Sequence, residues 1–154
     1  MVNLKKDTWL YALIASILII ISLFTPARII HLPIYGDVIN WLGGNIMYYL
    51  NTSVLHDDLF SLLLFGVALI SITILLTISI NSRKGNEIKR RSLFYLILGG
   101  ALLIFPIFYW LFEMDFAFET ISFASIGIFI SGIICIVTFV IDKFNTSRSK
   151  PSIA

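Results

Sequence analysis

The sequence has little charge and almost no cysteine. Charged residues make up 13% of its 154 positions, whereas soluble domains carry roughly 25%. Hydrophobic residues reach 58%, and the mean hydropathy is +0.96. The single cysteine, Cys135, excludes an intramolecular disulfide and the thiol-oxidoreductases that exchange a pair of cysteines. This composition excludes an ordinary soluble domain and predicts an integral membrane protein.

Four long apolar runs contain no Asp, Glu, Lys, Arg or His. They cover residues 8–24, 59–80, 92–112 and 121–141. Each is near the roughly 20 residues that cross a hydrocarbon core. Backbone polar groups in lipid must be paired within their own segment, so the runs are expected to be helices. Proton pumps, carboxylate-based ion carriers and haem held by histidines need ionisable groups inside the bundle, and their absence argues against all three.

The basic residues are sorted to one side of these runs. Ten of the eleven Lys and Arg residues fall there, and only Arg28 falls on the other side with six of the nine acids. Basic loops stay cytoplasmic during insertion. We therefore predict a multi-pass cell-membrane protein with both termini in the cytoplasm, and a short disordered tail over 145–154. The basic surface reflects topology and attraction to membrane lipids rather than nucleic-acid binding.

The expected fold class is all-α. It is a single domain, residues 1–144, built as a four-helix transmembrane bundle with a long first outer loop, residues 25–58. A fifth crossing within 29–50 would move the basic loop 81–91 to the outside, and Pro33, Gly43 and Gly44 would weaken its helix. A shorter piece of helix from Asp37 to the Gly43-Gly44 pair fits better. Loops of this length are usually functional, which makes this loop the first place to look for binding.

The first run has an alternative interpretation as a cleaved signal peptide. Lys5 and Lys6 give it a basic start, and Thr25-Pro26-Ala27 vaguely resembles a small-residue cleavage site. The apolar stretch is longer than the 7–15 residues usual in signal peptides, and Pro26 is badly placed for cleavage. Both interpretations leave the orientation of the other three runs unchanged.

Small residues recur at helical spacing in the fourth run. Five positions, spaced 3, 4, 4 and 3 apart, form one stripe: Ala124, Gly127, Ser131, Cys135 and Thr138. Membrane helices associate through close packing of such residues and through hydrogen bonds between helices. The stripe predicts the internal seam of a left-handed bundle, with contact to a partner helix as the alternative. Pro106 predicts a kink in the third run.

One cluster on the outer side has metal-ligand chemistry: His31, His56, Asp57 and Asp58. Three of these are adjacent in sequence, so their side chains diverge, and we interpret them as the polar start of the run 59–80. No nucleophile with a neighbouring base is visible. We therefore predict no catalytic, cofactor-binding or metal-binding residues, and no enzyme.

Aromatic residues in the outer loop are the candidate contacts with a partner or with lipid headgroups: Tyr35, Trp41, Tyr48 and Tyr49. Asn51-Thr52-Ser53 is an acceptor sequence for glycosylation at Asn51 on the same side.

The layout resembles that of the claudin and peripheral-myelin-type four-helix membrane proteins. The matching features are cytoplasmic termini, a long first and a short second outer loop, and small residues lining the bundle. In that family the first outer loop carries Gly-Leu-Trp followed by two cysteines, and it forms a small sheet over the helices. Here Trp41-Leu42-Gly43-Gly44 has an altered order and both cysteines are missing, so the sequence does not predict the sheet.

Three function hypotheses follow. The first is a non-enzymatic interaction or accessory subunit that uses the outer loop, with another membrane protein or a second copy as partner. The second is an oligomeric transporter or channel for a small neutral or lipophilic solute. The third is a membrane enzyme using His31, His56 and Asp57.

Overall fold

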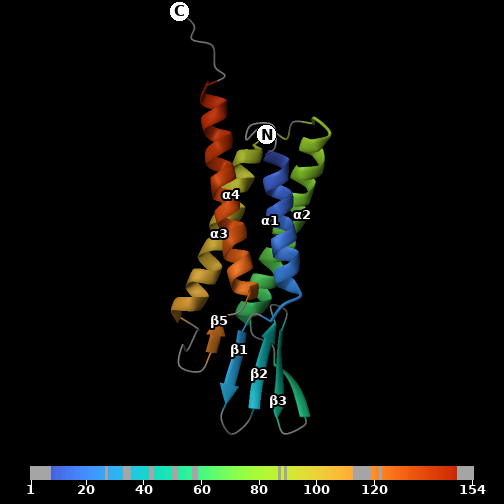
Figure 1. Cartoon of the computed structure of the whole chain (residues 1–154), viewed down its shortest axis with the longest axis vertical. Coiled ribbons are helices and arrows are strands. Elements are labelled where there is room, and N and C mark those ends of the chain that lie inside the picture. Colours follow the sequence, from blue (N-terminus) through green and yellow to red (C-terminus); the bar gives the residue numbers. More distant parts are fainter. Residues whose placement is uncertain are drawn as a thin grey trace, which may run out of the picture.

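A computed structural model of the chain describes residues 8–26, 28–32, 36–41, 44–49, 52–56, 59–86, 88, 90–112, 119–121 and 123–148, and in the strands it describes the backbone. Along the chain come α1 (Thr8–Leu23), β1 (Arg28–Leu32), β2 (Gly36–Trp41), β3 (Gly44–Tyr49), β4 (Thr52–His56), α2 (Leu59–Arg83), α3 (Arg91–Phe112), β5 (Glu119–Ile121) and α4 (Phe123–Arg148) (Figure 1).

The four helices expected from the apolar runs are confirmed. Three contain a stretch long and apolar enough to cross a membrane: Leu62–Arg83, Arg91–Phe108 and Phe123–Phe144. The 16 residues of α1 are apolar too, but they span only about 24 Å at 1.5 Å per residue. A typical hydrocarbon core is about 30 Å thick, so α1 is shorter than the thickness of the core. The other three helices are longer than α1.

Pro26 explains where α1 stops. The last turn closes with backbone bonds from Phe24 to Ile21 (3.1 Å) and from Thr25 to Ser22 (3.4 Å). The Thr25 hydroxyl also donates to the Ser22 carbonyl oxygen at 3.2 Å. Proline has no backbone N–H to continue this pattern, so the chain leaves the helix there and enters β1.

The fourth helix is longer than expected. It continues through residues 145–148, which the sequence assigned to the disordered tail, and so corrects that assignment. The apolar stretch ends at Phe144, and no proline or glycine follows before Pro151. Nothing in the sequence therefore stops the helix where the membrane span stops.

The segment 25–58, which was predicted to be an outer loop, forms strands. The prediction of a short helix from Asp37 is wrong. The segment contains four strands, and Asp37 lies within β2. A fifth strand comes from the connection between α3 and α4. The all-α class therefore holds for the bundle only. Antiparallel pairing satisfies the backbone groups of a long segment that has few helix-forming stretches and many β-branched residues.

The five strands form one antiparallel sheet in the order β4-β3-β2-β1-β5. β1 to β4 pair with their neighbours in sequence, as in a meander, and β5 adds to the free edge of β1. Arg28 pairs with Ile121 across that last junction. The two connections at this end of the bundle are thus joined in one sheet without a disulfide.

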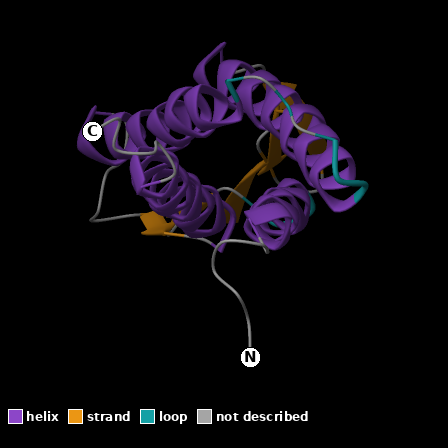
Figure 2. Cartoon of the chain, turned by 90° about the horizontal axis from the view of Figure 1, so that it is seen from above, coloured by secondary structure: helices purple, strands orange, loops and turns teal. Residues whose placement is uncertain are grey.

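The sheet lies at the end of the bundle opposite the start of α1 and the end of α4. Figure 1 shows the sheet below the helices, with the start of α1, the end of α4 and the end of α2 above them. Seen along the bundle, the strands lie beneath the helices (Figure 2). The helices therefore run alternately up and down.

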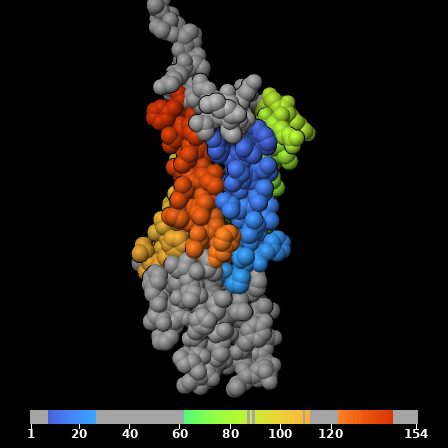
Figure 3. Space-filling model, viewed as in Figure 1, coloured from blue at the N-terminus to red at the C-terminus, as the bar shows by residue number. Residues whose placement is uncertain are grey.

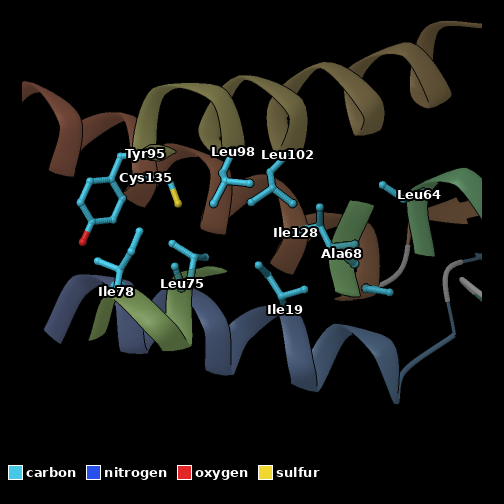
Figure 4. Packing of buried hydrophobic residues seen from close by; sticks show 13 residues of the cluster. Ile19, Leu64, Ala68, Leu75, Ile78, Tyr95, Leu98, Leu102, Ile128 and Cys135 are labelled. Atoms are coloured by element: carbon cyan, nitrogen blue, oxygen red, sulfur yellow. The ribbon is translucent and has the colours of Figure 1, made fainter. Parts of the chain in front are cut away.

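Large apolar side chains cover the outside of the bundle, and its interior combines apolar side chains with buried hydroxyls. Ile17, Ile70 and Ile97 are among the exposed residues, whereas Ser16, Ser71 and Ser131 are fully buried. α4 packs along both α1 and α3, and Figure 3 shows α1 and α4 side by side. α2 packs on α1 and meets α3 mainly through the side chains of the core (Figure 4). Apolar side chains on the outer surface and hydroxyls in the interior are expected of helices surrounded by lipid, which supports a membrane protein.

Candidate functional site: the five-stranded sheet

The register of the sheet sorts its residues into rows. One row of directly paired residues crosses four strands and is aliphatic throughout: Ile29, Ile39, Ile46 and Leu55. The next row outward is also apolar: Ile30, Val38, Met47 and Val54. Consecutive residues of a strand belong to opposite faces, so each face of the sheet carries one of these rows.

The first row shares its face with two of the aromatic residues. Trp41 is two residues from Ile39 on β2, and Tyr48 is two residues from Ile46 on β3, so both share that row's face. We call the set the aromatic face: Ile29, Ile39, Trp41, Ile46, Tyr48 and Leu55. His31 pairs with Asp37 farther out on the same face and adds polar positions at its rim.

The second face has a polar row next to the helices. Arg28 pairs with Asn40, Asn40 with Asn45, and Asn45 with His56. We call these four residues the polar row. It contains one permanent cation, two carboxamides and an imidazole, and no acid.

Neither face is covered by another described element. The helices meet the sheet at its end, as Figure 1 shows, and no helix among the described residues packs on it extensively. An isolated sheet normally buries at least one apolar face against a helix or a second sheet. The aromatic face is therefore a candidate surface for a partner.

The structure separates the aromatic residues singled out from the sequence. Trp41 pairs with Gly44 at the end of the sheet nearest the helices. Tyr48 and Tyr49 pair with Ser53 and Thr52 at the far end. Tyr35 and the acceptor residue Asn51 lie outside the described residues. These aromatic residues thus belong to two ends of one sheet and do not form a single loop surface.

The two histidines of the candidate metal cluster are far apart in the sheet. His31 is on β1 and His56 is on β4, with β2 and β3 between them. Three strand spacings of about 4.8 Å separate them by about 14 Å across the sheet, and the register places them three rows apart along the strands and on opposite faces. Asp57 and Asp58 lie outside the described residues. The sheet does not bring the histidines together.

The small-residue stripe of α4 lies inside the bundle. All five of its members are buried: Ala124, Gly127, Ser131, Cys135 and Thr138. A Cβ added at Gly127 would meet the Ser22 hydroxyl of α1, and one added at Gly99 of α3 would lie 3.1 Å from the Cys135 Cβ. The stripe therefore faces α1 at one end and α3 at the other.

Two hydroxyls bond across helices. Ser131 donates to the Ala15 carbonyl oxygen of α1 at 3.2 Å, and Ser79 of α2 donates to the Trp9 carbonyl oxygen at 3.0 Å. Thr138, another hydroxyl of the stripe, donates to the Ile134 carbonyl oxygen of its own helix at 2.7 Å. Membrane hydrogen bonds of this kind contribute about 1 kcal/mol or less each.

Sequence reasoning missed one ion pair. Arg91, the first residue of α3, pairs with Asp142 near the end of α4, and the shortest distance is 2.6 Å from Nη2 to Oδ1. The two residues directly flank the predicted third and fourth runs on the same side of the membrane. Their positions directly beside two runs, on the same side of the membrane, could have indicated the ion pair from the sequence.

No protein-family model, curated protein or solved structure matches this chain. The sheet and its register are therefore the main basis for assigning a function.

Proposed function

We propose that the chain is a non-enzymatic interaction or accessory subunit of a membrane complex, and that the aromatic face of its sheet binds the partner protein. The observation that supports this is the row of Ile29, Ile39, Ile46 and Leu55 across four paired strands, with Trp41 and Tyr48 on the same face. None of the described elements lies over it.

The energetics favour a covered face. Fully burying one Ile or Leu side chain is worth about 1.5–3 kcal/mol, and the row holds four of them. Aromatic residues on an apolar face, with polar positions such as His31 and Asp37 farther out on it, are typical of binding surfaces. A partner protein would therefore bury the aromatic face, which the chain's own described helices leave uncovered.

The proposed orientation places the sheet outside the cell. The end of the bundle opposite the sheet carries Arg83, Lys84, Arg90, Arg91 and Lys143, and basic loops remain cytoplasmic. α1 starts and α4 ends at that end. The partner is accordingly another membrane protein with an outer domain, or a second copy of this chain.

A relationship to the claudin and peripheral-myelin type is part of the proposal. It is supported by a layout of four helices with a sheet formed from the first connection. The specific residues are few, because Trp41-Leu42-Gly43-Gly44 has an altered order and both family cysteines are missing.

Neighbouring residues on opposite faces give a matched test. A photo-crosslinking amino acid is placed at Ile46 or at Met47 in the full chain, in its own membranes. The proposal predicts a crosslinked protein band from position 46 and at least fivefold less from position 47. Equal crosslinking from both positions, or none from either, would contradict it. A band with twice the mass of the chain would identify a second copy as the partner.

The oligomeric transporter stays a prediction. Its readout is solute flux in liposomes that responds to changes at Ser131 or Gly127. Both residues pack against α1, so a folding measurement must accompany the flux measurement.

A further inference from the structure

The polar row occupies a defined height above the helices. Arg28 is five residues past the end of α1, and His56 is three residues before the start of α2. Three residues span at most about 10 Å. Asn40 and Asn45 lie between them in the same row, on either side of the β2–β3 hairpin closed by the Trp41–Gly44 pair. The row thus crosses the sheet from β1 to β4 at the end nearest the helices.

That height matches the headgroup layer of a bilayer. The hydrocarbon core is about 30 Å thick, and the whole bilayer is about 40–45 Å thick. Each headgroup layer is therefore about 5–8 Å deep. The apolar run of α2 begins at Leu59, the first residue of the helix, which therefore lies at the border of the hydrocarbon core. His56 precedes Leu59 by three residues, so the polar row falls within or just above the headgroups.

The composition of the row suits a phosphate. Arginine presents a planar set of donors that matches phosphate oxygens, and carboxamides and an imidazole add further donors. All four positions share one face, whereas Trp41 and the aliphatic row belong to the other. Glu119 pairs with Ile30 and so lies diagonally from Arg28, and Asp57 and Asp58 directly follow His56 in the sequence.

From this placement we propose that the polar row is a binding site for the phosphate of anionic phospholipids in the leaflet on the sheet side. It fixes the sheet upright on the membrane, so that the aromatic face points sideways toward a neighbour. Arg28, the only basic residue predicted on this side, supplies the charge that distinguishes anionic from zwitterionic lipid.

The test compares retained lipids. The full chain is exchanged into mixed micelles containing equal amounts of phosphatidylglycerol and phosphatidylcholine, and native mass spectrometry counts the lipids that remain bound. The wild type is expected to retain phosphatidylglycerol preferentially. Arg28→Gln is expected to lower the phosphatidylglycerol-to-phosphatidylcholine ratio about fivefold, because one cation near an anionic surface is worth that factor.

Two further variants make the result decisive. Lys84→Gln removes an exposed cation at the opposite end of the bundle and controls for general charge. Asn45→Asp keeps the size of the side chain, adds a negative charge to the row, and is expected to lower the ratio as Arg28→Gln does. The proposal is overturned if Arg28→Gln and Asn45→Asp leave the ratio unchanged, or if Lys84→Gln lowers it equally.

The proposal of a lipid site and the proposal of a partner surface can be tested independently. Ile46→Asn changes the aromatic face and is expected to leave lipid selectivity unchanged. Arg28→Gln is expected to leave crosslinking from position 46 detectable. A loss of selectivity in Ile46→Asn as large as that in Arg28→Gln would overturn the assignment of the lipid to the polar row.

Discussion

Arg91 holds Asp142 with three hydrogen bonds. Its Nη2 lies 2.6 Å from Oδ1, and its Nε lies 3.1 Å from Oδ1 and 3.2 Å from Oδ2. Arg91 begins α3, and Asp142 lies 51 residues later, on α4, with a side chain that is 8% exposed. The pair therefore ties the start of one helix to the end of another where the bundle reaches the basic surface.

We expect this pair to stabilise the bundle. The Arg91 side chain is 32% exposed, which reduces the contribution below that of a fully buried pair. Arg91→Ala and Asp142→Ala should each lower the free energy of unfolding by about 1–2 kcal/mol. Denaturant unfolding in detergent, followed by circular dichroism, measures both. The double variant should lose clearly less than the sum, and strictly additive losses would show that the two side chains are not coupled.

Two glycines distinguish tight helix packing from open space. A Cβ at Gly132 would lie 2.9 Å from Leu103 Cγ and 3.1 Å from the Leu102 backbone carbon, whereas a Cβ at Gly100 would meet nothing within 4 Å. Gly132→Ala should therefore separate α3 from α4 and cost about 1–3 kcal/mol. Gly100→Ala should be neutral or stabilising by up to about 1 kcal/mol, because alanine favours a helix. Equal effects on the unfolding midpoint would contradict the packing described between these helices.

Two hydroxyls differ in whether they have a partner. The Tyr95 hydroxyl is buried and has none, while the Ser79 hydroxyl donates to the Trp9 carbonyl. Tyr95→Phe should leave the free energy of unfolding unchanged or raise it by about 1 kcal/mol, because an unsatisfied buried group is removed. Ser79→Ala should lower it by about 1 kcal/mol or less. A clear loss of stability in Tyr95→Phe would mean that its hydroxyl bonds something in the membrane.

The proposed orientation can be read from thiol labelling. Cys135 is buried, so it should not react in the folded chain, and Cys135→Ser gives a background without thiols. In that background Thr52→Cys reports on the far end of the sheet and Asn86→Cys on the α2–α3 turn. A membrane-impermeant maleimide added to intact cells should label position 52 and leave position 86 unlabelled until the cells are opened. The reverse pattern would invert the orientation.

The helices could be predicted because each depends on its own apolar run. The observed bounds of α2 and α3 lie within three residues of the expected ones, since a membrane span is set by local composition. The end of α4 was missed because the helix outlasts its apolar stretch, and a short polar tail without proline or glycine gives no stop signal before Pro151.

The sheet could not be predicted from the same information. Its strands are short, and the pairing of Arg28 with Ile121 joins residues 93 positions apart, so no local pattern specifies it. The missing cysteines also removed the feature that marks such a sheet in the claudin-type layout. In retrospect, Gly36 and Gly44, each followed by a short run that contains β-branched and aromatic residues, were the available signals for two of the strands.

The most direct test of the proposed function is native mass spectrometry of the chain extracted in mild detergent from its own membranes. The wild type should appear as a complex above 17.4 kDa. Trp41→Ala with Tyr48→Ala should release it as a monomer, whereas Met47→Ala, on the other face, should keep the complex. A wild-type monomer without a protein partner, or a complex that survives the loss of Trp41 and Tyr48, would contradict a partner-binding role for the aromatic face.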